Sequence, residues 1–170
     1  MPNAMSDSSA DGQATLVLIK PDAIRRGLAG AVLSRLETLQ LEVIGAKVVR
    51  VSQALAEEHY KNIKGKPFFQ ETVDYIRGKF HGTTYAFALV FWGQDAIERV
   101  RQLAGATNPE RADPRSVRGV LGRNLTTGLM ENVLHTSSDP SEAEREIRLW
   151  FHPSELLREP WVSEPSNRRP

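Results

Sequence analysis

Two apolar runs restrict the fold of this chain more than any other feature of its sequence. TLVLI at residues 15–19 and TYAFALVFW at residues 84–92 are apolar on both faces of an extended chain, which is typical of strands buried inside a sheet. LEVIGAKVVRV at residues 41–51 is rich in β-branched side chains and predicts a third strand. The chain is therefore expected to build its core around a covered β-sheet.

Helical patterns alternate with these strands. Apolar residues recur at helical spacing over residues 29–39, and two short helices are expected at 54–60 and 69–76. Asp95 is a candidate N-cap for a further helix, which should end just before Gly105.

The last third of the chain begins with an unusually long connection. Residues 105–131 are crowded with Gly, Pro, Asn and Arg, and a loop of this length in a compact domain is usually functional or disordered. Residues 132–137 can form a last short strand, and DPSE at 139–142 combines cap, proline and glutamate in the pattern that starts a helix, here running to about Phe151. The element order reduces to the split βαββαβ pattern, an α+β fold whose four-stranded antiparallel sheet carries helices on one face.

Length and charge limit the classes of protein that this chain can belong to. The 170 residues fit one ordinary domain, which we assign to residues 14–157, with a disordered N-terminal tail at 1–13 and a C-terminal tail at 158–170. No apolar run approaches the roughly 18 residues that a membrane helix needs. The formal charge of +1 gives no general electrostatic reason to expect a nucleic-acid or membrane partner.

Cysteine is absent, which excludes disulfides, zinc thiolate sites and cysteine nucleophiles. The polar N-terminal residues also lack the charged and apolar regions of a signal peptide. We therefore expect a cytoplasmic protein that depends on packing for its stability.

Three polar side chains interrupt apolar patterns. Glu146 lies within the inward stripe of the last helix, Arg101 shares the stripe of the helix before the long connection, and strand alternation places His135 on one face with Val133 and Ser137. Each has a structural interpretation: a cation near a helix end, a surface ion pair, or a hydrogen-bonded histidine. Because all three flank one arginine-rich connection, a shared site becomes an equally good interpretation.

This set of residues suits phosphate chemistry. Arginines can offer paired donors to anionic oxygens, and Lys20 at the end of the first strand adds a point charge. The chain has neither a G-x-x-x-x-G-K-[ST] loop nor a protein-kinase glycine loop with its HRD motif. Since cysteine is absent, a neutral imidazole is the best candidate for a nucleophile. The arginines in question are Arg101, Arg111, Arg115, Arg118 and Arg123.

Several ordered motifs resemble those of the nucleoside diphosphate kinase family. They are TLVLIKPDAIRRGLAGAVLSRLE, HYKNIKGKPFF, GATNP, RG at 118–119, NVLH with Ser137 beyond it, and EREIRLWFHPSEL, and they cover residues 14–157. The resemblance implies a ferredoxin-like αβ sandwich. It also implies ping-pong transfer of the γ-phosphate of a nucleoside triphosphate, typically ATP, to a nucleoside diphosphate, with Mg²⁺ on the nucleotide phosphates.

The resemblance also implies roles for individual residues. His135 would be the nucleophile that becomes a phosphohistidine, with Ser137 and Glu146 as the groups that orient or support it. A base would stack on Phe68, with Leu129 opposite. The positions that match phosphate and ribose ligands are Lys20, Tyr60, Arg101, Thr107, Arg118 and Asn132. No metal ligand is expected from the protein, and the remaining histidines, His59, His81 and His152, are interpreted as structural.

The chain departs from the family pattern at two insertions, near residues 77–84 and 120–128. GRN at 122–124 imitates the family's motif before its histidine, but the spacing favours Asn132, which puts Glu131 where the family commonly has arginine. Either Ser138 or Asp139 can fill the family's acidic position after the histidine. A homo-oligomer is implied, and because the long connection builds subunit contacts in this family, both a tetramer and a hexamer stay open.

Two other functions compete with the enzyme. The insertions would suit a nucleotide-binding regulatory module that has lost turnover. The loop arginines could bind nucleic acid, but the near-neutral charge and the lack of aromatic residues between those arginines argue against a specific nucleic-acid site.

Overall fold

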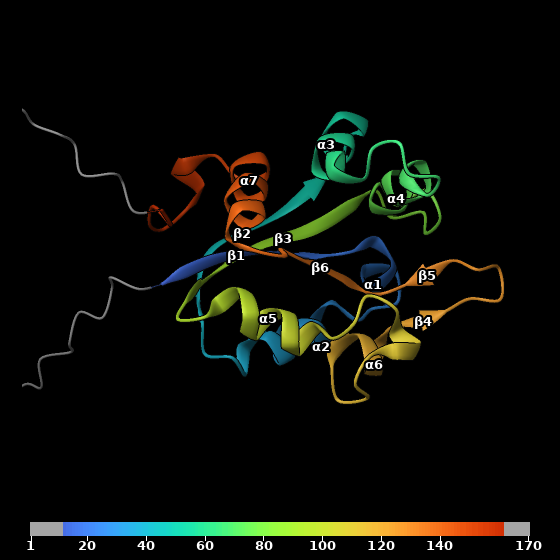
Figure 1. Ribbon diagram of the computed structural model, residues 1–170, viewed down its shortest axis with the longest axis horizontal. Helices are drawn as coiled ribbons and strands as arrows, with labels where there is room; N and C mark the ends of the chain where they lie inside the picture. Colours follow the sequence, from blue (N-terminus) through green and yellow to red (C-terminus); the bar gives the residue numbers. More distant parts are fainter. Residues whose placement is uncertain (1–11, 162–170) are drawn as a thin grey trace, which may run out of the picture.

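The computed structural model describes residues 12–161, which form a four-stranded antiparallel sheet with helices around it (Figure 1). The strand order is β2-β3-β1-β6, which is the order of the split βαββαβ pattern. The predicted α+β fold is therefore confirmed. The strands are β1 (Gln13–Ile19), β2 (Glu42–Arg50), β3 (Tyr85–Gly93) and β6 (Leu134–Thr136).

The helices agree with the predicted pattern and add two short ones. The additions, α1 and α6, lie in segments that the sequence suggested were turn and loop. The helices are α1 (Pro21–Arg25), α2 (Ala29–Glu37), α3 (Gln53–His59), α4 (Phe69–Ile76), α5 (Ala96–Ala104), α6 (Val117–Leu121) and α7 (Pro140–Trp150), with 3₁₀ turns η1 (Lys61–Ile63), η2 (Pro109–Arg111) and η3 (Pro153–Glu155).

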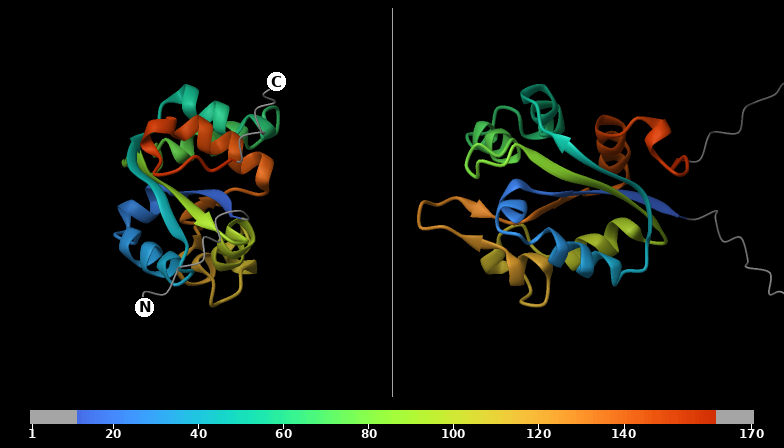
Figure 2. Two further views of the ribbon diagram at one scale, coloured as in Figure 1. Left: turned by 90° about the vertical axis from the view of Figure 1, so that its left-hand side faces the viewer. Right: turned by 180° about the vertical axis from the view of Figure 1, so that it is seen from behind.

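Helices cover both faces of the sheet, so the prediction of helices on one face was wrong. One apolar core packs Leu16 and Leu18 of β1 against Val73 of α4 and Ile147 of α7. Alternation sends Val17 and Ile19 to the other face, where they meet α2 and α5. Figure 1 shows α3, α4 and α7 above the sheet and α2, α5 and α6 below it, and both views of Figure 2 show the same layers. The continuous apolarity of β1 follows from this double covering.

The last strand is shorter than predicted because the backbone breaks at Val133. This residue has φ +59°, in the left-handed region that β-branched side chains rarely adopt. The regular strand therefore begins only at Leu134, and Val133 packs in the same core as Leu134 and not on the face of His135. The predicted face-sharing of Val133 with His135 was wrong, because strand alternation holds only where the backbone stays extended.

The long connection is structured. After α5 ends at Gly105, which has φ +81°, the chain forms η2, α6 and a small hairpin of β4 (Arg123–Asn124) and β5 (Met130–Glu131). In Figure 1 the tip of this hairpin extends away from the body of the protein. Each helix of the connection has a side-chain cap, from Asn108 and from Ser116, which accounts for regular structure in a segment rich in Gly and Pro.

Two expected helix caps had different outcomes. The Asp139 carboxylate accepts a hydrogen bond from the Glu142 backbone N–H, 2.9 Å away, and α7 starts at Pro140 as predicted. Asp95 precedes α5 with φ +51° and makes no side-chain capping bond, so the capping role assigned to it was wrong.

The domain boundaries are close to those expected. β1 takes in Gln13, the last residue of the predicted tail, because this residue pairs with Gly93. Residues 1–11 and 162–170, where most of both predicted tails fall, lie outside the described residues. Within the described part of the C-terminal segment, Arg158 pairs with Glu42 at 2.9 Å. Over residues 12–161, no helix has the length and apolarity to cross a bilayer.

Candidate functional site

The proposed nucleophile belongs to a hydrogen-bonded group built by β6 and α7. His135 Nε2 lies 2.9 Å from Glu146 Oε1, and the Ser137 hydroxyl donates to Glu146 Oε2 over 2.7 Å. Strand alternation puts His135 and Ser137 on one face, and the helical periodicity of α7 turns Glu146 toward them. The Glu146 side chain is only 4% exposed, so the predicted inward direction of Glu146 is confirmed.

This group determines the tautomer of His135. A buried carboxylate accepts hydrogen bonds, so the network assigns the ring proton to Nε2 and leaves the Nδ1 lone pair free. The Ser137 oxygen also accepts the Leu16 backbone N–H at 3.1 Å, which holds the hydroxyl with its proton toward Glu146. Glu146 is in turn 3.9 Å from a nitrogen of Arg145. The arrangement orients the imidazole and can stabilise positive charge that develops on it.

Cations gather near His135. Lys20, at the end of β1, donates from Nζ to Asn132 Oδ1 at 2.7 Å, and burial followed by the nearby Arg118 guanidinium lowers the pKa of Lys20 to about 8. Burial and the neighbouring Arg101 lower the pKa of Arg118 to about 10. Arg118 is held by the Gly105 and Leu134 carbonyls at 2.7 and 2.9 Å.

None of these three cations forms a salt bridge in the part of the chain that the structure describes. Lys20 and Arg118 are desolvated cations without a carboxylate partner, and such groups favour the approach of an anion. Arg101 is exposed on α5, so it does not point into the protein body as predicted. It faces the cavity instead.

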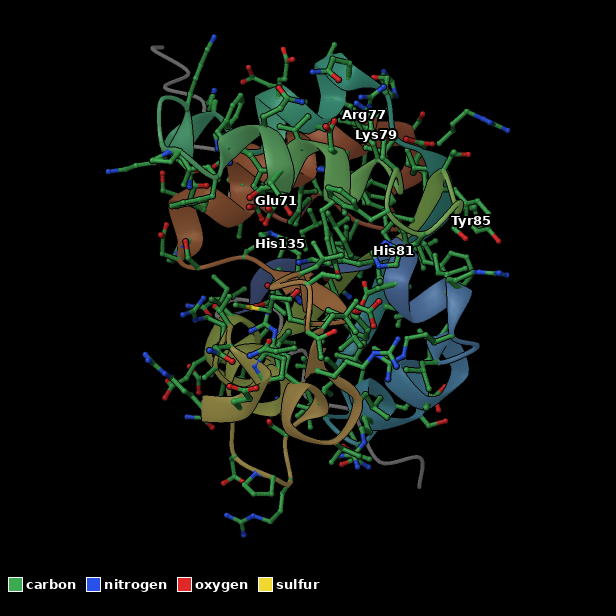
Figure 3. The ribbon with its side chains drawn as sticks, turned by 90° about the vertical axis from the view of Figure 1, so that its right-hand side faces the viewer. Glu71, Arg77, Lys79, His81, Tyr85 and His135 are labelled. Atoms are coloured by element: carbon green, nitrogen blue, oxygen red, sulfur yellow. The ribbon has the colours of Figure 1, made fainter. Side chains whose placement is uncertain are left out.

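One cavity of about 650 Å³ brings the predicted residues together. It is bounded by the turn that follows α3, by α4, the end of α5, α6, the hairpin and β6. Figure 3 looks toward this side, with His135 between the two layers. Of the eleven predicted site residues, Ser137 and Glu146 lie behind His135, and nine line the cavity: Lys20, Tyr60, Phe68, Arg101, Thr107, Arg118, Leu129, Asn132 and His135.

The two asparagines that compete for the family motif occupy different places. Asn132 lines the cavity, where its amide also donates to the Thr107 carbonyl at 3.1 Å. Asn124 lies on β4 and donates to Asn108 at 3.0 Å. The spacing argument for Asn132 therefore agrees with the geometry.

The outer part of the cavity has apolar walls from two separate elements. Phe68, next to α4, is 52% exposed, and Leu129 comes from the hairpin, directly before β5. The exposed ring of Phe68 beside the cavity offers a flat face on which another ring can stack.

Sequence reasoning missed the position of His59. Its ring lies 4.5 Å from that of His135 between centroids, and its Nδ1 accepts the Trp150 indole N–H at 3.1 Å. Burial, and then the neighbouring His135, lower the pKa of His59 well below its usual value, which keeps this second imidazole neutral beside the first. No local pattern reveals this contact, because the two histidines come from α3 and β6.

An imidazole in a cation-lined cavity, on a split βαββαβ sheet, is the arrangement expected of phosphotransferase enzymes that bind nucleotides. The family model described as nucleoside diphosphate kinase matches residues 13–156. The chain belongs to this family, whose enzymes move the γ-phosphate of a nucleoside triphosphate to a nucleoside diphosphate.

Curated relatives cover most of the chain. A nucleoside diphosphate kinase of Desulfitobacterium hafniense (strain Y51) is 42% identical over 155 residues, which is 88% of this chain and 98% of the relative. One from Thermococcus kodakarensis is 43% identical, over 84% of this chain and 79% of the relative.

Solved structures agree. A transition-state mimic of the Borrelia burgdorferi nucleoside diphosphate kinase, with bound vanadate and ADP, has a TM-score of 0.78 at 34% identity, over 87% of this chain and 92% of that one. A Halobacterium salinarum enzyme in complex with CDP has a TM-score of 0.77 at 39% identity, over 89% and 94% of the two chains.

Proposed function

We propose that His135 carries the phosphoryl group between the two nucleotides. The observation that supports this proposal most is the Glu146 carboxylate on His135 Nε2, which leaves Nδ1 as the free nitrogen of a ring that lines the cavity. Nδ1 attacks the γ-phosphorus of the bound triphosphate. The new N–P bond forms as the bond to the bridging oxygen breaks, and the nucleoside diphosphate leaves with the electron pair on its β-phosphate oxygen.

The other residues hold and neutralise the phosphates. The phosphohistidine ring becomes positively charged, and Glu146 stabilises that charge while it keeps the Nε2 proton in place. Lys20, Arg101 and Arg118 supply positive charge to the phosphate oxygens, while Asn132, Thr107 and Tyr60 contribute polar contacts to phosphate and ribose. A second nucleoside diphosphate then attacks the phosphorus of the phosphohistidine, and the same steps run in reverse.

The base occupies the apolar end of the cavity. It stacks on Phe68 and has Leu129 on its other side. ADP in the Borrelia structure and CDP in the Halobacterium structure show that relatives bind both a purine and a pyrimidine diphosphate. An apolar slot contacts the faces of a base and not its hydrogen-bonding edge, so we expect similar tolerance here.

The donor set fits a magnesium ion that is held by the nucleotide. Mg²⁺ prefers oxygen ligands, and among the described residues that line the cavity Glu71 supplies the one carboxylate. The nearest metal-like cluster, formed by His59, His135 and Glu146, is rich in nitrogen and suits other ions. When bound to the phosphates, the ion neutralises their charge. The homo-oligomer, either tetramer or hexamer, and the cytoplasmic location stay predictions.

Phosphoenzyme labelling tests this function. Incubation of the wild-type protein with ATP labelled at its γ-phosphate should give an acid-labile phosphoprotein that loses its label on addition of any nucleoside diphosphate. His135→Ala should take up no label, whereas His152→Ala, which changes an exposed histidine outside the cavity, should be labelled normally. A His135→Ala protein that still becomes labelled would overturn the assignment. ATP binding by wild type without labelling would indicate a regulatory module.

A further inference from the structure

A buried carboxylate is one of the groups that attach the hairpin carrying Leu129 to the body of the protein. Strands β4 and β5 have two residues each, and a two-stranded hairpin of this size has little stability by itself. Glu131, at the base of the hairpin, is 4% exposed in its side chain. It lies between Met130 and Asn132 in the chain, and both of these residues line the cavity. Contacts that fix the position of Glu131 therefore also fix the cavity wall formed by Met130 and Asn132.

Three bases from separate segments surround this carboxylate. Arg123, opposite Glu131 on β4, donates to Oε2 at 2.6 Å, and Arg26, which follows α1, lies 3.6 Å from the same oxygen. His81 Nε2 is 3.1 Å from Oε1. Although burial alone would raise it, the hydrogen bonds and charges of Arg123 and His81 hold the pKa of Glu131 below its usual value. Glu131 is thus an ionised group that connects the hairpin to the ends of α1 and α4.

His81 contacts both walls of the cavity. Its side chain is 6% exposed, and its ring meets the ring of Tyr75 edge to face, with 5.1 Å between centroids. Tyr75 is on α4 and lines the cavity. Figure 3 shows His81 at the level of the sheet, below Arg77 and Lys79 of the same segment. His81 therefore fills the space between α4, next to which Phe68 lies, and the hairpin that carries Leu129.

Both members of this contact lie where the chain departs from the family pattern. By the resemblance described in the sequence analysis, His81 belongs to the insertion near residues 77–84, and Glu131 stands where the family commonly has arginine. An arginine at 131 would face Arg26 and Arg123, whereas the carboxylate pairs with both and also meets His81, fifty residues away in the sequence.

We propose that His81 and Glu131 are positioning residues that set the width of the base slot, so that they determine nucleotide affinity and leave the rate of phosphoryl transfer unchanged. The inference rests on the proposed function. The triphosphate end of the cavity is held independently, because Lys20, Arg118 and Thr107 fix Asn132 without the help of His81.

A double-mutant cycle on the full chain tests the pair. His81→Ala and Glu131→Ala should each raise the Kd for ADP, measured by calorimetry, about tenfold, since each leaves a buried polar partner unsatisfied. The double variant should lose no more than the larger single effect. The rate of phosphoenzyme formation at saturating ATP should stay within about twofold of wild type in all three. Additive losses, or an unchanged Kd, would overturn the proposal.

Two further variants separate positioning from stability. His81→Gln should restore ADP affinity, because its amide N–H can donate to Glu131 as the imidazole does. Val32→Ala removes buried volume from α2, away from the cavity, and should lower the melting temperature without a change in Kd. If Val32→Ala weakened ADP binding as much as His81→Ala, the role would be only structural. A wild-type protein that neither binds ADP nor becomes labelled would instead overturn the proposed function.

Discussion

Replacement of Glu146 by glutamine measures how much the negative charge beside the proposed nucleophile His135 contributes to the rate of phosphoryl transfer. The carboxylate accepts two hydrogen bonds, from His135 and from Ser137. A glutamine has nearly the same shape and can offer its oxygen to His135, while its amide group donates to the Ser137 oxygen, which has a second lone pair. The ring proton then stays on Nε2, and Nδ1 stays free. The substitution removes the charge and retains the tautomer.

The expected loss of rate follows from the difference between charged and neutral hydrogen bonds. A hydrogen bond to a charged group contributes about 1.5 to 3 kcal/mol and a neutral one about 0.5 to 1.5 kcal/mol, so the transition state loses about 1 to 2 kcal/mol, or roughly 5- to 30-fold in rate. Glu146→Ala removes both acceptors and leaves two buried donors unpaired. Its loss should reach roughly 100- to 1000-fold, similar to the removal of a group that stabilises transition-state charge.

Rapid-quench measurement of phosphoenzyme formation at saturating ATP gives these rates directly. Glu144→Gln is the matched control, because this glutamate on the same helix forms an exposed pair with Arg148. Its rate should equal that of wild type. The reasoning fails if Glu146→Gln reacts as fast as wild type, or if the glutamine and alanine variants are equally slow.

Two other predictions concern binding. Since the pKa of Lys20 is about 8, the Kd for ADP from calorimetry should rise between about pH 7 and about pH 9, and Lys20→Met should remove that part of the dependence. The stability of the free protein should instead increase with pH. Between about pH 8 and about pH 10.5 Lys20 binds its proton in the unfolded chain but not in the folded one, so the free energy of unfolding rises over this range. Phe68→Ala should raise the Kd for ADP and for CDP alike, by roughly 5- to 30-fold. A loss confined to one base would contradict a slot that contacts only the faces of the base.

Local patterns predicted the elements that carry the chemistry. The start of α7 followed from DPSE, the direction of Glu146 from helical periodicity, and the shared face of His135 and Ser137 from strand alternation. These three features depend on residues close together in sequence. The cluster on β6 and α7 could therefore be predicted from the sequence alone.

Contacts between distant segments could not be derived in this way. His81 meets Glu131 across fifty residues, and His59 meets Trp150 and His135 because α3 packs beside α7. The covering of both faces of the sheet also depends on where the short helices pack. The left-handed backbone at Val133 could not be predicted either, because valine favours an extended chain.

The break at Val133 also explains a spacing in the sequence. Asn132 and His135 are an odd number of residues apart, so in a regular strand they would serve opposite sides of the sheet. One left-handed residue between them shifts this parity, so that both side chains line the same cavity. The Asp22 carboxylate accepts the Val133 N–H at 3.1 Å, and the Val133 carbonyl accepts the Lys20 N–H at 2.9 Å. The segment that supplies Lys20 to the cavity thus also holds Val133 in its left-handed conformation. The reversal of side-chain direction between Asn132 and Leu134 therefore depends on hydrogen bonds to residues 20–22, which the sequence around Val133 does not reveal.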